Sequence, residues 1–189
     1  NRRKANLKMY EFGNVYQFNP EADQSEKVLA PYSEHTSLGI WMTGNDVEGN
    51  WAKKETAVTV YDLKAVVENM FARLGVTAGE LVMTQASDDV FSAKLDITNR
   101  GGKAVGALGV VKYALLKKMD IEQPVFFAEF NWDAIVKLAA KKKVTFTDLP
   151  KTQPVKRDLA LLVDQAVTFA QIEKVVKASE KKLLQGVSL

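Results

Sequence analysis

Short apolar or alternating stretches separated by polar turns make up most of the first 140 residues. Segments of this kind, rich in branched and aromatic residues, are typical of β-strands. The pattern predicts strands over residues 7–18, 37–43, 80–84, 94–98, 104–111 and 125–130. Gly13 and Asn14 predict a bend, a bulge or a tight hairpin inside the first of them. Residues 99–102, with two adjacent glycines, predict the turn of an antiparallel hairpin.

Two helices are indicated, one between these strands and one after the last of them. Thr59 can cap the first helix, Asp62 stands at its third position, and Gly75 supplies a left-handed stop. Its apolar face comprises Leu63, Val66, Val67, Met70 and Leu74. Asn131 caps a second, shorter helix, and polar residues predict a loop over 19–31 and a turn over 44–50. Hairpins combined with separate helices predict an α+β fold with an antiparallel or mixed sheet and flanking helices.

The last 36 residues carry a different pattern. Residues 159–163 form a short apolar run behind a proline and a charge pair, which predicts a buried strand. Thr168 and Gln171 then have the spacing of a capping box, and Val167 and Ile172 that of a hydrophobic staple. The helical stripe continues through Val175, Val176, Ser179 and Leu183.

A further strand is predicted to start after Gly186, at Val187, which would complete the first half of a split βαβ unit. An ordinary strand–helix unit with a good cap is the plainer alternative.

Composition limits the function classes. The 189 residues fit one medium domain, or one domain and part of another, and 47% are hydrophobic, which is ordinary for a globular protein. No stretch approaches the length of a membrane span, and the N-terminus lacks the apolar core of a signal peptide. Without cysteine there are no disulfides, which suits a reducing cytoplasm.

The charge is unevenly distributed. From Lys141 onward ten Lys and Arg stand against five Asp and Glu (+5), and before it sixteen stand against eighteen (−2). The basic excess in the last segment suits a phosphate-bearing partner.

The last segment resembles the opening of the ferredoxin-like anticodon-binding domain that ends the bacterial phenylalanyl-tRNA synthetase beta chain. The residues that carry this resemblance are Pro154, Arg157, Asp158 and the apolar run over 159–163. Earlier segments are similar to the catalytic-like domain of the same family, namely residues 7–16 (LKMYEFGNVY), 61–64 (YDLK), 67–68 (VE), 105–109 (VGALG) and 127–130 (FAEF). Residues 89–93 and 111–112 depart from the family, which usually has His-Pro-Gly and His-Pro there.

The resemblance implies a C-terminal fragment of such a beta chain. It implies a non-catalytic core like that of class II aminoacyl-tRNA synthetases over residues 1–146, a linker over 147–153, and the first half of the anticodon-binding domain over 154–189. It also implies a cytoplasmic (αβ)2 heterotetramer that binds tRNA(Phe). Phenylalanine activation with ATP and Mg²⁺ would take place on the alpha chain, and this fragment would need no cofactor.

The residues themselves offer little for catalysis. The five arginines are Arg2, Arg3, Arg73, Arg100 and Arg157. None stands in a glycine-rich strand followed by a helix, where a class II enzyme places its ATP-binding arginine, so we expect no catalytic residue.

The single histidine, His35, lies in a stretch expected to be a polar loop. One histidine makes neither a triad nor a metal site, so no metal ligands are predicted. Gly106 and Gly109 have the spacing of an RNA-binding GXXG loop, but their apolar flanks favour strand glycines that let backbones approach closely.

Lys156 and Arg157 are the candidate tRNA-binding residues. The alternative for Arg157 is an ion pair with Asp158 or another local carboxylate. Half a domain cannot close a core, so we expect the helix face of Ile172, Val175, Val176 and Leu183 to be covered by the first domain or by a second copy in a homodimer. Two other functions remain open, a regulatory interaction module without a tRNA role and a small-molecule enzyme with an unrecognised pocket.

Overall fold

The computed structural model describes residues 4–21, 29–140, 142, 146, 148 and 151–188. The chain divides into two compact units, residues 1–144 and 145–189, and each is considered by itself. Parts of the predicted loop over 19–31 and of the predicted linker over 147–153 lie outside the described residues. So do Arg2, Arg3 and Lys141.

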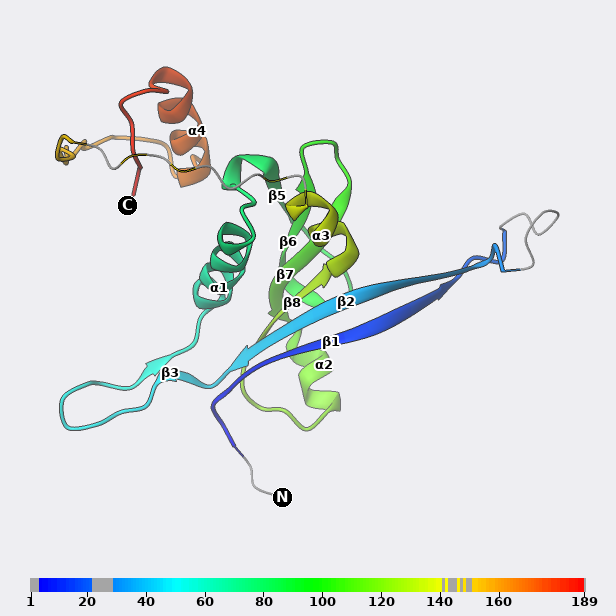
Figure 1. The fold of residues 1–189 in the computed structure, drawn as a ribbon. Helices are drawn as coiled ribbons and strands as arrows, with labels where there is room; N and C mark the ends of the chain where they lie inside the picture. Colours follow the sequence, from blue (N-terminus) through cyan, green and yellow to red (C-terminus); the bar gives the residue numbers. More distant parts are fainter. Residues whose placement is uncertain are drawn as a thin grey trace. The chain divides into compact units, whose positions relative to one another are not determined.

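The first unit contains one large sheet and three α-helices within its described residues (Figure 1). The strands are β1 (Leu7–Phe18), β2 (Tyr32–Thr43), β3 (Asn45–Val47), β4 (Thr56–Ala57), β5 (Leu81–Ala86), β6 (Phe91–Asn99), β7 (Ala104–Val111) and β8 (Val125–Asn131). The helices are α1 (Val60–Arg73), the short 3₁₀ helix η1 (Ala78–Glu80), α2 (Tyr113–Lys118) and α3 (Trp132–Ala139).

Six strands form the sheet in the order β1-β2-β8-β7-β6-β5, and every neighbouring pair is antiparallel. The predicted α+β class with an antiparallel sheet is therefore confirmed at this level. The predicted hairpin is also present, because β6 and β7 are joined by a turn in which Gly102 has a φ of 77°. Only residues without a Cβ adopt that conformation at little cost.

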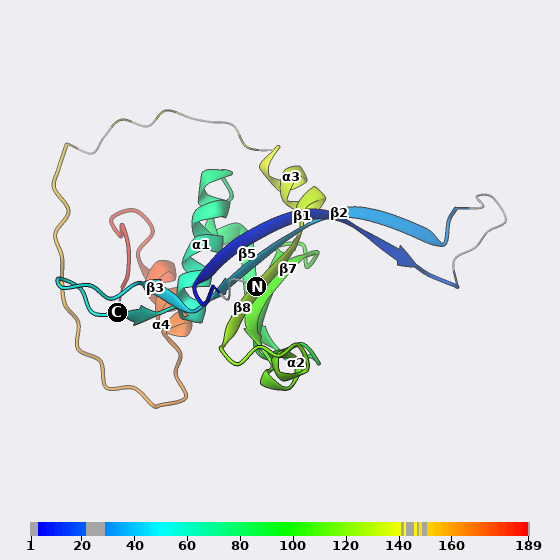
Figure 2. The same cartoon turned by 90° about the horizontal axis from the view of Figure 1, so that it is seen from below.

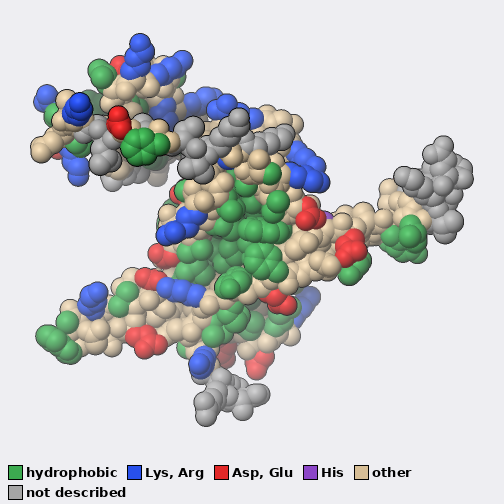
Figure 3. All heavy atoms as spheres, viewed as in Figure 1, with side chains coloured by type: hydrophobic (Ala, Val, Ile, Leu, Met, Phe, Trp, Pro, Cys, Tyr) green, Lys and Arg blue, Asp and Glu red, His purple; other side chains and the backbone are tan. Residues whose placement is uncertain are grey.

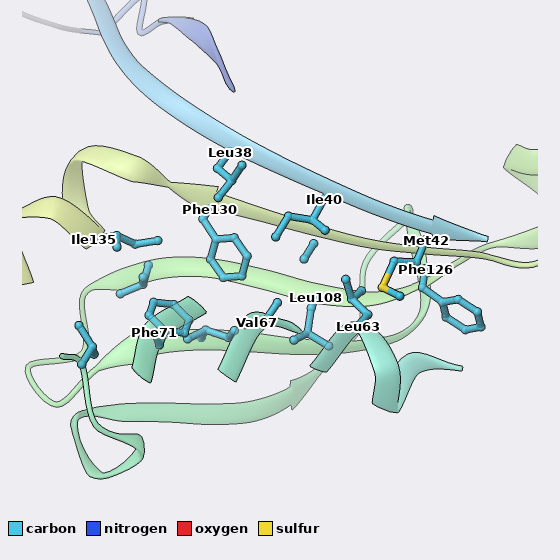
Figure 4. Packing of buried hydrophobic residues seen from close by; sticks show 14 of the residues in the cluster. Leu38, Ile40, Met42, Leu63, Val67, Phe71, Leu108, Phe126, Phe130 and Ile135 are labelled. Atoms are coloured by element: carbon cyan, nitrogen blue, oxygen red, sulfur yellow. The ribbon is translucent and has the colours of Figure 1, made fainter. Parts of the chain in front are cut away.

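The core lies between the sheet and α1, with α3 closing one end (Figure 4). Leu63, Val67 and Phe71 of α1 are directed at Leu108 and Phe130 of the sheet, and all five are almost completely buried. Burying each such side chain contributes about 1.5–3 kcal/mol. This helix-on-sheet layer holds β1 and β2 in place for the surface described below.

Helix α1 begins and ends where its local residues predict. The backbone N–H and the hydroxyl of Thr59 both donate to the Asp62 carboxylate, at 2.7 and 2.6 Å. These bonds hold the pKa of Asp62 below its usual value. Gly75 follows the helix with a φ of 76°. Phe71, which the predicted apolar face omitted, is one of the most buried residues of the helix.

Several local predictions were wrong. Gly13 does not interrupt β1, which pairs with β2 without a break from Leu7↔Thr43 to Phe18↔Tyr32. His35 lies inside β2 and not in a loop, because β2 begins five residues earlier than predicted. The turn predicted over 44–50 contains β3, which pairs with β4.

In the second unit, helix α4 (Phe169–Ser179) is the one regular element among the described residues. The predicted cap is present, since the N–H and the hydroxyl of Thr168 both donate to the Gln171 side chain, at 2.8 and 3.2 Å. Leu183 lies beyond the end of the helix.

The strands predicted on either side of α4 are wrong. Residues 159–163 are irregular and exposed, and Val187 is not in a strand. A strand needs a neighbour for its backbone N–H and C=O groups, and the described part of this unit offers none. Coverage of the α4 face by another surface stays a prediction, with Val175 and Leu183 exposed here.

Candidate protein–protein interface

Strand β1 is an edge strand of the sheet and reaches far beyond it. It pairs with β2 along all twelve residues, whereas β2 pairs with β8 only from Ser37 to Thr43. Residues 14–18 and 32–36 therefore form a two-stranded ribbon that projects past the other strands (Figures 1 and 2). An uncovered edge strand of this length is a ready surface for another chain.

One face of β1 carries a row of aromatic residues. Alternate residues of a strand point to the same side. The even-numbered positions of β1 lie opposite Leu38 and Ile40, which are core residues, so they share the face that α1 covers. We call the exposed aromatic residues of this face the aromatic stripe, with exposed fractions of 74% for Tyr10, 48% for Phe12, 71% for Tyr16, 59% for Phe18 and 62% for Tyr32 of β2.

The inner end of the stripe borders an apolar groove of about 380 Å³. Its floor comes from Leu38, Ile40 and Met42 of β2, and its wall from Val66 and Met70 of α1. The remaining lining residues are Lys8, Met9, Tyr10, Phe12, Trp41 and Trp132. Hydrophobic side chains gather between α1 and the β1–β2 ribbon in Figure 3. Exposed apolar surfaces of this kind are rare on monomeric proteins and usually mark a site of contact with another protein.

Ring contacts hold several stripe residues in place. Phe12 packs edge-on against Trp132, with ring centroids 4.9 Å apart, and Phe18 packs against Tyr32 at 5.1 Å. Such pairs contribute about 0.5–1.5 kcal/mol each beyond burial. The contact of Phe12 with Trp132 therefore orders the inner end of the stripe before any partner binds, which lowers the entropy lost on binding there.

Charged groups lie at the margins of this surface. Among the residues that the structure describes, Lys8 is the one charged residue that lines the groove, and it forms an ion pair with Asp46. The surface offers no acid–base pair for chemistry, and its physical properties favour docking of another apolar surface.

The stronger electrostatic clusters lie outside the groove. Lys94 bridges Asp96 and Asp88, at 2.8 and 3.0 Å, and these two carboxylates raise the pKa of Lys94. The Phe91 N–H and Lys94 lower the pKa of Asp88 to about 2.

Hydrogen bonds also lower the pKa of Glu80. It accepts hydrogen bonds from Lys142 and Thr77, which lower its pKa to about 2. Asp88 and Glu80 are partly buried, and they have the low pKa values of structural ion pairs.

Comparison with protein families identifies the family of the chain. The model of the phenylalanyl tRNA synthetase beta chain CLM domain matches residues 1–132. The chain belongs to this family.

Curated relatives agree with the assignment. The chain is similar to the phenylalanine–tRNA ligase beta subunits of Bacteroides fragilis strain YCH46 (47% identical), Porphyromonas gingivalis W83 (42%) and Lactococcus lactis IL1403 (30%), and each comparison covers all of this chain. It spans only 23%, 23% and 22% of the length of those relatives.

Two glycines of β7 act as predicted. Gly106 and Gly109 lie in β7, and a Cβ at either position would overlap a backbone carbonyl oxygen, that of Glu129 or of Ala93. They are sites of close backbone approach and not an RNA-binding loop.

The sheet face opposite α1 carries a second aromatic group. Trp41 stacks on Phe127 at 5.0 Å, and Phe127 stacks on Phe91 at 6.0 Å. This row lies across β2, β8 and β6 and is partly buried, so it stabilises the sheet.

The residues predicted for tRNA binding lie in the second unit. Lys156 and Arg157 are both exposed, and neither forms an ion pair within residues 151–188. The alternative pairing of Arg157 with Asp158 is therefore not formed. A role in tRNA binding stays a prediction.

The described residues were also searched for other kinds of site. They contain no group of three His, Cys, Asp or Glu side chains that could hold a metal ion. Among them, too, every helix is too short or too polar to cross a membrane.

The aromatic stripe was not identified from the sequence. Its signal is present, because Tyr10, Phe12, Tyr16 and Phe18 alternate along one strand. Aromatic residues in a strand usually indicate core, and the edge position of β1 makes this face accessible.

Proposed function

We propose that the chain is a non-catalytic part of a phenylalanine–tRNA ligase beta subunit that supports the alpha chain and contributes to tRNA(Phe) binding. In this proposal the first unit is a core like that of class II synthetases, without its chemistry. The six-stranded antiparallel sheet with helices packed on one face supports this assignment.

The aromatic stripe is the observation that carries the proposal. Five large aromatic side chains lie on one face of strands β1 and β2, and between about half and three quarters of each is exposed. The relatives are named beta subunits, a name that implies a subunit of another kind. We therefore assign the stripe to the alpha chain of an (αβ)2 assembly, with the aromatic residues as anchors.

Catalysis is proposed to take place on the alpha chain, together with the ATP and Mg²⁺ sites. Adenylate formation needs cationic groups on the phosphates. Arg73 ends α1, and Arg100 lies in the β6–β7 turn, where its Nε donates to the Gly79 carbonyl. These placements leave neither arginine on the sheet, which favours a supporting role.

The proposed tRNA contact rests on the second unit. Lys156 and Arg157 are exposed in a segment with an excess of basic residues. Neither forms an ion pair with a described Asp or Glu side chain, so both are accessible to phosphate groups.

Co-expression with a phenylalanyl-tRNA synthetase alpha chain tests the proposal. We expect a stable complex on size-exclusion chromatography, and a Tyr16→Ala variant should weaken it. Recovery of the two chains as separate species would argue instead for an interaction module unrelated to tRNA charging.

The apolar groove favours one alternative function, that of a small-molecule enzyme. Its volume of about 380 Å³ lies within the range of small-molecule pockets, although its described lining residues include a single charged one, Lys8. A shift in the melting temperature of the isolated chain with ATP and phenylalanine would favour an enzyme, and no shift is expected.

A further inference from the structure

The loop between β3 and β4 projects from the first unit and has an ordered turn at its tip (Figure 1). Asn50 organises its tip, since its side-chain oxygen accepts from the N–H groups of Ala52 and Lys53, both at 2.9 Å. The Asn50 N–H also donates to the Lys53 carbonyl at 2.9 Å. This turn fixes the backbone on both sides of Trp51.

Trp51 is fully exposed at this tip, with an exposed fraction of 100%. The other two tryptophans are partly buried, because Trp41 stacks on Phe127 and Trp132 packs against the core. A tryptophan that covers nothing in its own fold has no role in stability. Its large flat ring is accessible from both faces.

The charges of the hairpin are separated along its length. Its three acids are engaged near the base, where Asp46 pairs with Lys8, Glu48 accepts from Asn6 and Glu55 accepts from Asn45. Residues 49–54 contain Lys53 and Lys54 and no acid. In the part of the chain that the structure describes, neither lysine takes part in an ion pair. The tip is therefore a positively charged aromatic surface.

We propose that this tip binds single-stranded RNA, with Trp51 stacking on a base and Lys53 and Lys54 contacting the flanking phosphates. Single-stranded RNA is bound by this combination, because an exposed base stacks on an aromatic ring while cations neutralise its backbone. A protein partner fits less well, since lysine is depleted in the centre of protein interfaces. The inference rests on the proposed function only for the choice of RNA, and it uses a site separate from Lys156 and Arg157.

The test is a titration of the 189-residue chain with an unstructured, fluorescently labelled 12-nucleotide RNA at several salt concentrations. Binding should quench the emission of exposed tryptophan, and stacking should make Trp51→Ala about five- to 150-fold weaker. Trp51→Phe retains an aromatic ring and should restore most of the affinity. Replacing both lysines by Gln should lower the slope of log affinity against log salt by about 1.4, since each phosphate contact on a single strand contributes about 0.7.

Matched variants separate this site from others. Lys117→Gln with Lys118→Gln removes the same charge from the exposed end of α2 and should leave binding unchanged. Lys156→Gln with Arg157→Gln should leave the quenching of Trp51 intact, even where the total affinity falls. The melting temperature of the Trp51→Ala variant should equal that of the parent.

Three results would overturn the inference. They are unchanged RNA affinity in Trp51→Ala, quenching by phosphatidylserine vesicles but not by RNA, and loss of the alpha-chain complex in Trp51→Ala with RNA binding retained. The alpha-chain complex measured with the same variants keeps this test distinct from that of the proposed function. A hairpin that does not bind RNA leaves that complex intact.

Discussion

Tyr16 provides the sharpest test of the aromatic stripe as a subunit contact. It lies on the projecting ribbon, is 71% exposed, and forms none of the ring pairs that hold Phe12 and Phe18. Its replacement by Ala should therefore cost the isolated fold well under about 1 kcal/mol, as for other surface changes. An effect on assembly can then be measured without unfolding the chain.

The size of that effect follows from the exposed area. An aromatic side chain buries about 150–250 Å², so roughly 140 Å² of Tyr16 is available to a partner. At about 25 cal/mol per Å² this area gives an upper limit of about 3.5 kcal/mol. Ordering costs reduce it, and a typical anchor residue contributes about 2 kcal/mol, which corresponds to about thirtyfold in the dissociation constant.

The assay is the dissociation constant of the alpha-chain complex, measured by titration of purified chains. Tyr61 gives the matched control, because it is the same residue type, is 77% exposed, and lies on α1 outside the groove. Tyr61→Ala should change the dissociation constant less than about twofold. Equal effects of the two substitutions would refute the assignment of the stripe to the alpha chain.

Three further predictions concern stability and RNA. Gly109→Ala places a Cβ against the Ala93 carbonyl oxygen and should lower the free energy of unfolding by about 1–3 kcal/mol, whereas Gly13→Ala, with open space around it, should be neutral in the same urea titration. Asp88 has a pKa lowered to about 2, so its stabilising effect is present above its usual pKa of 3.8 and is lost as the pH falls toward 2. Asp88→Asn should flatten that part of a stability–pH profile, and a profile identical to the parent would contradict the ion-pair assignment. Arg157→Ala in the complete ligase should reduce the salt slope of tRNA binding by about one phosphate contact, and an unchanged slope would exclude that contact.

Elements with strong local signals could be predicted from the sequence. The hairpin of β6 and β7 is determined by its two-glycine turn, and α1 and α4 by their capping residues Thr59 and Thr168. Helix α2 was missed because its first residue follows Lys112, which makes no side-chain cap. Short elements without caps or turn glycines leave little local signal.

Elements that depend on distant partners could not be predicted in the same way. Residues 159–163 have the composition of a buried strand, but composition does not supply the neighbouring strands that would pair with them. For the aromatic stripe, the local signal is present and the structural context is missing. Its alternation is visible in the sequence, yet its exposure follows from the position of β1 at the sheet edge. The position of a strand in the sheet decides whether its side chains are exposed, and the periodicity of the sequence does not reveal that position.

The projecting two-stranded ribbon has a consequence for the lifetime of the unassembled chain. Within the described part of the chain, residues 14–18 and 32–36 pair as strands only with each other, and an isolated pair of strands is marginally stable in water. Their amide hydrogens should exchange much faster than those of residues 37–43, and proteases should cut there first. A partner that seals this ribbon would slow both processes, so newly made copies without one are expected to be cleared from the cell sooner than assembled ones.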